Sequence, residues 1–143
     1  MELREIREGE TALAARTLLE LRPAFGTPEA ITVQADGQRA AGYRLAGAFV
    51  DGAQDAAAVA GFRIAESLAW GRALYVDDLV THPDHRGAGL ATALLAWLDE
   101  EARRAGCHEL HLDSGVVPER QAAHRRYFGH GMRIAAYHFT KFL

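Results

Sequence analysis

The sequence predicts an α/β (α+β) fold in which helices flank a mixed β-sheet, within a single domain that spans residues 1–143. Three observations lead to this prediction. Segments with strand character alternate with segments of helix character, and such alternation builds a sheet covered by helices. A chain of 143 residues is long enough to bury one hydrophobic core. No repeat, low-complexity segment or linker divides it.

The chain begins with a strand followed by two helices. Alternating side chains over residues 2–7 are typical of a short, edge-like strand. Leucines spaced among alanines predict a helix over residues 9–21, which Pro23 ends. Residues 28–38 are ambiguous in character, and we interpret them as a further short helix.

A hairpin of two strands comes next. The segments 43–50 and 56–64 have strand character, and the turn-rich loop between them has hairpin length. Gly61 interrupts the second segment, and a glycine inside a strand indicates a bulge. Trp70 and Gly71 then form a turn into the next strand.

Residues 75–104 form the stretch around which the chain is organised: a strand, a glycine-bearing turn and an amphipathic helix. Leu74, Val76, Leu79 and Val80 are the apolar residues of a mostly buried strand. Proline within His82-Pro83-Asp84 predicts a turn. A helix is expected from Gly89 or Leu90, because apolar residues recur there at the helical period, and Gly106 is its expected C-terminal cap.

The last part of the chain is expected to contribute a strand, a helix and a final strand. Residues 109–113 alternate in character, Pro118 or Glu119 opens a helix that runs to Phe128, and residues 132–142 have a strand pattern.

A strand, a glycine turn and a helix together form the layout of a phosphate-binding site. Unpaired N–H groups in the first helical turn and the helix dipole both favour an anion, and Arg86 adds a positive charge. The spacing matches neither a dinucleotide fingerprint nor a P-loop, since Thr92 stands where a third glycine belongs and no Gly-Lys-Ser/Thr follows. From the residues alone, a plain chain reversal remains an equal alternative.

Two blocks of sequence resemble the GCN5-related N-acetyltransferase (GNAT) superfamily. Arg86-Gly87-Ala88-Gly89-Leu90-Ala91 is similar to its Arg/Gln-x-x-Gly-x-Gly/Ala signature. At the right distance downstream, Ala123-His124-Arg125-Arg126-Tyr127 and then Gly131-Met132 look like its Ala-x-x-x-Tyr helix, which ends in Gly-Phe. The resemblance implies a mixed, mostly antiparallel central sheet and an acetyl-CoA-dependent N-acetyltransferase.

The resemblance also implies which residues would hold the cosubstrate. Backbone N–H groups near the end of the central strand are the expected partners of the pantetheine arm and the thioester oxygen, and the glycine turn with the first helical turn would hold the diphosphate. The cofactor-binding residues expected on this basis are Leu79, Val80, Thr81, Arg86, Gly87, Ala88, Gly89, Leu90, Ala91 and Thr92.

Tyr127 and Asp77 are the expected catalytic residues. Tyr127 corresponds to the family tyrosine that protonates the departing thiolate, and a phenol with a pKa of about 10 can donate a proton at neutral pH. Its alternative role is simple packing. Many family members carry an acid at the position of Asp77, acting as a base directly or through water. Asp78 is a weaker candidate, since consecutive strand residues face opposite sides; otherwise these carboxylates cap turns or pair with arginines.

Composition and charge narrow the classes of partner. A net charge of −3 without any basic tract argues against nucleic acid, and no stretch is long enough to span a membrane. The spacing of the seven histidines predicts no metal site, and the one cysteine, Cys107, is expected to be a buried small hydrophobe. We expect a cytoplasmic enzyme with a small-molecule primary amine as acceptor, direct attack without an acyl-enzyme, and, as a hypothesis, a homodimer paired through the last strand.

Several other functions remain open from sequence. A protein lysine or N-terminal acetyltransferase would use the same cofactor block. A non-catalytic acyl-CoA sensor would bind the cosubstrate and be indifferent to Tyr127→Phe. A nucleotide-binding α/β domain would prefer ATP or NAD, and a purely structural domain would bind none of them.

Overall fold

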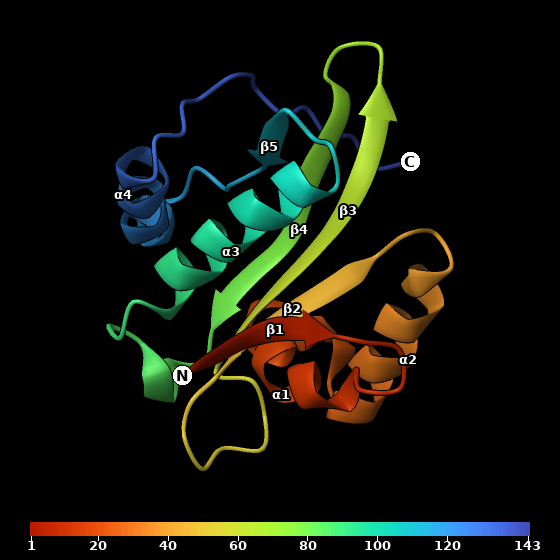
Figure 1. The fold of residues 1–143 in the computed structure, drawn as a ribbon, viewed down its shortest axis with the longest axis vertical. Coiled ribbons are helices and arrows are strands. Elements are labelled where there is room, and N and C mark those ends of the chain that lie inside the picture. Colours follow the sequence, from red (N-terminus) through yellow and green to blue (C-terminus); the bar gives the residue numbers. More distant parts are fainter. The chain divides into compact units, whose positions relative to one another are not determined.

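The computed structural model describes all residues, 1–143, and contains a five-stranded sheet in the order β1-β2-β3-β4-β5 (Figure 1). The chain divides into two compact units, Met1–His111 and Leu112–Leu143, which are described separately below. The elements are β1 Glu2–Ile6, α1 Ala12–Leu21, η1 Pro23–Phe25, α2 Pro28–Arg39, β2 Arg44–Phe49, β3 Ala58–Ser67, β4 Gly71–Thr81, η2 Pro83–His85, α3 Leu90–Arg104, β5 Glu109–Leu112, η3 Pro118–Arg120 and α4 Gln121–Gly129. The α/β class with a mostly antiparallel sheet is confirmed.

Local sequence accounts for the helix boundaries in the first unit. The α1 helix ends at Leu21, before Pro23, because proline cannot continue the hydrogen-bonded ladder. The Thr27 side chain accepts a hydrogen bond from the Ala30 N–H and caps α2, which confirms the short helix expected there. Gly106 has a φ of +78°, so it ends α3 in the left-handed conformation that glycine adopts without strain.

The strands β1 to β4 form consecutive antiparallel pairs, with β1 at the edge of the sheet. The bulge expected at Gly61 is present, because the register between β3 and β4 shifts between Gly61 and Phe62. Gly61 lies opposite Asp78, whereas Phe62 lies opposite Val76. Asp77 is therefore the extra residue, and the bulge lies on β4.

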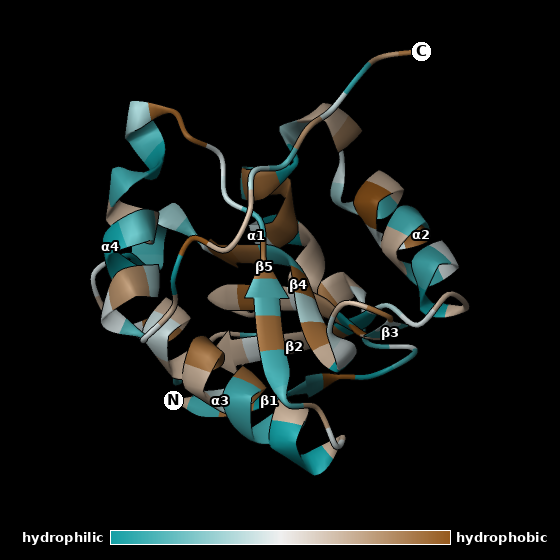
Figure 2. Ribbon diagram, turned by 90° about the horizontal axis from the view of Figure 1, so that it is seen from above, coloured by the Kyte–Doolittle hydropathy of each residue, from teal (hydrophilic) through white to brown (hydrophobic).

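Helices cover both faces of this sheet, as Figure 2 shows with the strands between α3 on one side and α1 and α2 on the other. Phe62 of β3 is fully buried and packs edge-on against Trp97 of α3. The neighbouring residue Gly61 faces the opposite side, where Tyr43 joins the buried cluster formed with α1 and α2. The apolar layer that α1 and α2 bury contains Ile6, Ala14, Leu18, Ile31, Leu45 and Val59.

The second unit contains η3 and α4, followed by a C-terminal segment without regular structure. The strand expected over residues 132–142 is wrong: residues 132–143 form neither helix nor strand. The expectation rested on alternating side chains alone, but a strand also requires a hydrogen-bonded neighbour. Large apolar side chains of this segment are exposed, namely Ile134, Tyr137, Phe139, Phe142 and Leu143.

None of the helices combines the length with the apolar character that a transmembrane span requires.

Candidate active site

The loop between β4 and α3 has the geometry of an anion-binding turn. Gly87 and Gly89 have φ angles of +79° and +77°, in the left-handed region, and a Cβ on either would meet no atom within 4 Å. Glycine is required at both positions by the backbone conformation and leaves an open approach to the main chain. Arg86, Gly87, Ala88 and Gly89 are all exposed, so a ligand can reach this turn.

The first turn of α3 presents unpaired N–H groups next to that loop. Gly89 occupies the N-cap position, has no side chain to cap the helix, and its carbonyl accepts the first helical hydrogen bond, from the Ala93 N–H. The backbone N–H groups of Leu90, Ala91 and Thr92 therefore lack helical partners. The side chains of Leu90 and Ala91 are buried, so these two residues can serve a ligand only through their backbone.

The end of β4 has one free edge. Leu79, Val80 and Thr81 pair with Ala60, Val59 and Ala58 of β3. On the other side of β4 lies β5, which has only four residues. The residue before it, His108, donates a hydrogen bond from its N–H to the Arg72 carbonyl, so β5 begins near the start of β4. A strand of that length, starting beside Arg72, is too short to reach Leu79. Backbone N–H groups of residues 79–81 that point to this edge are thus available.

Asp77, the expected base, forms a two-pronged ion pair with Arg63 of β3. The Arg63 Nη2 donates to Oδ1 at 2.7 Å and its Nε donates to Oδ2 at 2.9 Å. The hydrogen bonds to Asp77 raise the pKa of Arg63 above its usual value. Asp77 is therefore a carboxylate held in a fixed orientation, with one lone pair on each oxygen still open.

Asp78 lies in a closed network on the same face. Its Oδ2 accepts a hydrogen bond from the Tyr43 hydroxyl at 2.7 Å, and its Oδ1 accepts one from the Arg22 Nε at 2.9 Å. The Arg22 Nη2 also donates to the Asp77 carbonyl, at 3.2 Å. Burial, and then the Asp78 carboxylate, raise the pKa of Tyr43 well above its ordinary value.

This network corrects the expectation that the two carboxylates face opposite sides of the sheet. Arg63 and Gly61 are two residues apart on β3 and share a face, and Asp77 and Asp78 contact partners on that face. The bulge supplies the extra residue that breaks strict alternation. Sequence reasoning missed the roles of Tyr43, Arg22 and Arg63, although Gly61 pointed to the bulge.

Tyr127, the expected acid, lies in α4 of the second unit and is buried, with 8% of its surface exposed. Its carbonyl accepts hydrogen bonds from the N–H groups of His130 and Met132, which close the helix end. Within the same unit, the His124 Nε2 lies 2.8 Å from the Gly115 carbonyl oxygen and ties α4 to the loop before it.

Cys107 is buried, and the burial raises the pKa of its thiol, so the thiolate form is disfavoured. This is the environment expected of a small hydrophobe rather than of a nucleophile. No group of three or more His, Cys, Asp or Glu side chains is arranged to hold a metal ion.

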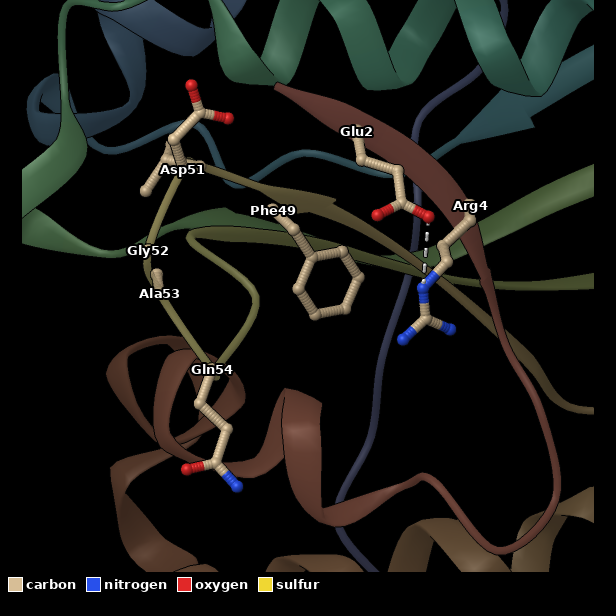
Figure 3. A pocket seen from close by; sticks show the side chains of 8 residues that line it. Glu2, Arg4, Phe49, Asp51, Gly52, Ala53 and Gln54 are labelled. Carbon is tan, nitrogen blue, oxygen red and sulfur yellow. Dashed lines mark ion pairs between the residues drawn. The ribbon is translucent and has the colours of Figure 1, made fainter.

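A cavity of about 350 Å³ lies elsewhere, at the edge formed by β1 and the loop after β2 (Figure 3). Arg4 covers the Phe49 ring there, 4.6 Å from its centroid, and pairs with Glu2. None of the residues expected for catalysis or cosubstrate binding lines this cavity.

A family model described as "Acetyltransferase (GNAT) family" matches residues 12–132, which is most of the chain and includes both sequence blocks. The chain belongs to the GNAT acetyltransferase family. The match begins at the start of α1, so it also includes the helices and the hairpin for which the sequence offered no motif.

Two relatives of this GNAT protein carry the names of N-acetyltransferases. The aminoalkylphosphonate N-acetyltransferase of Salmonella typhimurium is 38% identical over 68 residues, 48% of this chain and 43% of the relative. The glucosamine 6-phosphate N-acetyltransferase of Trypanosoma brucei brucei is 47% identical over 45 residues, 31% of each chain. The matching segments thus span less than half the length of either relative.

Solved structures of GNAT proteins resemble the whole chain. A Trypanosoma brucei acetyltransferase has a TM-score of 0.76 at 25% identity and covers 99% of both chains. A ribosomal-protein-alanine N-acetyltransferase from Brucella melitensis has a TM-score of 0.77 at 24% identity, over 100% of this chain and 98% of the other. At this level of identity the second likeness shows the fold alone.

Proposed function

We propose that this GNAT protein is an acetyl-CoA-dependent N-acetyltransferase that moves acetyl to a primary amine of a small molecule, by direct attack and without an acyl-enzyme. The observation that carries the proposal is the exposed turn with two left-handed glycines, which leads into an uncapped N-terminus of α3. Unpaired N–H groups and the helix dipole at such a terminus favour the diphosphate of CoA. The buried thiol of Cys107 supports a route without a covalent intermediate.

The loop between β4 and α3 and the end of β4 would bind different parts of acetyl-CoA. Arg86 and the backbone of residues 87–92 would hold the diphosphate, and free N–H groups within residues 79–81 would bind the pantetheine arm and the thioester oxygen. Donors fixed in advance at a developing negative charge stabilise a transition state by several kcal/mol, because they need no reorganisation. When bound, acetyl-CoA supplies the acetyl group and a thiolate leaving group.

Asp77 would take the proton of the incoming ammonium, directly or through one water, and Tyr127 would donate a proton to the departing thiolate. Aspartate has a shorter side chain than glutamate, and the Asp77 carboxylate is held against Arg63, which favours the relay through water. Asp78 is a poorer base because its side chain is only 13% exposed and is closed off by the buried Tyr43 hydroxyl, whereas the Asp77 side chain is 25% exposed.

The acceptor is proposed to be a small amine, since the named relatives are N-acetyltransferases of an aminoalkylphosphonate and of glucosamine 6-phosphate. We keep the single domain, the cytoplasmic location and the absence of nucleic-acid and membrane partners as predictions. The homodimer stays a hypothesis, and the last strand through which it was expected to pair is not present in the structure. Light scattering that finds a monomer at micromolar concentration would remove it.

Calorimetric binding of acetyl-CoA, with ATP and NAD as competitors, tests the cosubstrate. We expect acetyl-CoA to bind and Arg86→Gln to weaken it by about tenfold, as the loss of one charged contact to a phosphate does. Arg103→Gln on the exposed side of α3 is the matched control, since Arg103 forms an ion pair with Glu100 of its own helix and lies far along the helix from its N-terminus. A preference for ATP or NAD would instead indicate a nucleotide-binding domain.

The two alternatives that share the cosubstrate are separated by turnover. If the wild-type protein acetylates no amine, and the Tyr127→Phe variant binds acetyl-CoA as tightly as wild type, the protein is an acyl-CoA sensor. Acetylation of peptides in preference to small amines would point to a protein lysine or N-terminal acetyltransferase.

A further inference from the structure

The ion pair between Arg63 and Asp77 is accessible to a ligand, whereas the neighbouring carboxylate, Asp78, is not. The Arg63 and Asp77 side chains are 44% and 25% exposed, and no second side chain donates to Asp77. Asp78, by contrast, is 13% exposed and is closed by the buried Tyr43 hydroxyl. A ligand can therefore reach Asp77 and Arg63 together, whereas Asp78 is a fixed part of the fold.

Aromatic rings form the floor beside this open pair. The Arg63 guanidinium lies over the Tyr75 ring, 5.4 Å from its centroid, and Tyr75 is stacked on Trp70 at 6.3 Å. His111 of β5 stacks on Trp70 at 3.7 Å, and its Nε2 lies 2.7 Å from Glu109. The stacked rings support one face of the guanidinium, and 44% of the Arg63 side chain stays exposed to solvent.

The proposed proton transfer to Asp77 would leave the positive charge of Arg63 without a negative partner. When Asp77 accepts a proton from the acceptor ammonium, an N–H bond breaks, an O–H bond forms on the carboxyl group, and the amine lone pair becomes free for attack. The neutral acid then no longer balances Arg63, whose guanidinium keeps its charge at any accessible pH. An acceptor that is only cationic would enter beside this charge and leave it without a partner.

We propose that the acceptor is a zwitterion, a primary amine with a phosphonate, phosphate or carboxylate nearby, whose amine is received by Asp77 and whose anion is bound by Arg63. This inference rests on the proposed function and defines its substrate class. The two charges of the ligand replace the two charges of the internal pair. The Nη1 group of Arg63, which donates neither hydrogen bond to Asp77, and the second N–H of Nη2 remain as donors for oxygens of the anion.

Paired acceptors that differ in the anionic group test the proposal in steady-state acetylation. The pairs are aminomethylphosphonate with methylamine, and glucosamine 6-phosphate with glucosamine. Wild type should prefer the anionic member of at least one pair. Arg63→Gln should raise KM for that member by about 10- to 100-fold, as expected for lost hydrogen bonds to a charged group, and should raise KM far less for its partner without the anion.

The ratio of kcat/KM within one pair does not depend on the fraction of folded enzyme, so a partly unfolded variant still gives an answer. Arg63→Lys should restore part of the preference because it keeps the charge and loses the fork, and Arg103→Gln should have no effect. Equal loss for both members of each pair, or a wild-type preference for amines without an anion, would overturn the zwitterion class while leaving the acetyltransferase intact. Absence of turnover with every amine would overturn the proposed function and this inference with it.

Discussion

Replacement of Gly61 by alanine tests the network at the β4 bulge most severely. A Cβ at this position would lie 1.9 Å from the Tyr43 hydroxyl oxygen, 2.5 Å from Cζ and 2.8 Å from Cε1. Ordinary van der Waals contact begins near 3.4 Å, so the hydroxyl must move by about 1.5 Å. The 2.7 Å hydrogen bond to Asp78 does not survive such a movement.

The expected loss of stability has two parts. Forcing a methyl group into a packed site costs about 1–3 kcal/mol, because the ring must shift within the buried cluster. Loss of the hydrogen bond between the Tyr43 hydroxyl and the Asp78 carboxylate adds about 1–3 kcal/mol, because both groups then lack a partner. Gly61→Ala should therefore lower the free energy of unfolding by about 2–6 kcal/mol, a large share of the 5–15 kcal/mol typical of a domain.

Urea unfolding of three variants measures this loss. Gly37→Ala is the matched control, since Gly37 lies inside α2 with nothing within 4 Å of its Cβ position, and it should stabilise the protein by about 0.5–1 kcal/mol. Adding Tyr43→Phe to Gly61→Ala should relieve only part of the clash, because the ring carbons remain too close. A Gly61→Ala loss below about 0.5 kcal/mol, within the range of surface substitutions, would refute the reasoning.

Three further predictions concern the site. Burial, and then the Asp78 carboxylate, raise the pKa of Tyr43, so its contribution to stability is complete below the unfolded pKa of about 10 and is lost as pH rises toward the folded value. Urea midpoints from pH 8 to about 11 should thus fall more steeply in wild type than in Tyr43→Phe, and equal slopes would contradict this buried environment of the hydroxyl. Cys107→Ala should keep kcat within about twofold, since the buried thiol has no place in direct transfer, whereas a large loss of kcat would indicate an acyl-enzyme. Gly89→Ala should raise KM for acetyl-CoA about tenfold. Gly26→Ala, at a position outside the loop that also has a positive φ of +81°, should likewise destabilise the protein but leave KM unchanged; equal KM values for the two variants would exclude the loop from binding.

The conformation of the proposed cosubstrate loop was the part most accessible from sequence, because its signals are local. The left-handed conformations of Gly87 and Gly89 follow from two glycines before an apolar helix, and their spacing from Arg86 identified the family. The bulge was indicated by Gly61 within a strand pattern.

The contacts of Asp77 and Asp78 could not be predicted to the same degree, because they join residues distant in sequence. Asp78 meets Arg22 and Tyr43 across 56 and 35 positions, and no local pattern pairs them. The alternation rule failed at Asp77, since a bulge shifts the face of every later residue. The alternating pattern over residues 132–142 predicted a strand, but alternation cannot supply the neighbour with which a strand must pair.

Release of CoA from acetyl-CoA across a panel of amines, measured for wild type and Tyr127→Phe side by side, tests the central claim most directly. The panel contains polyamines, aminoglycosides, amino sugars and their phosphates, aminophosphonates, amino acids, arylalkylamines and short peptides. We expect amine-dependent release by wild type and a fall of kcat by about 100-fold in Tyr127→Phe, because the variant lacks the proposed general acid. A protein that releases no CoA with any amine, and that acetyl-CoA does not stabilise against thermal unfolding, would contradict the account.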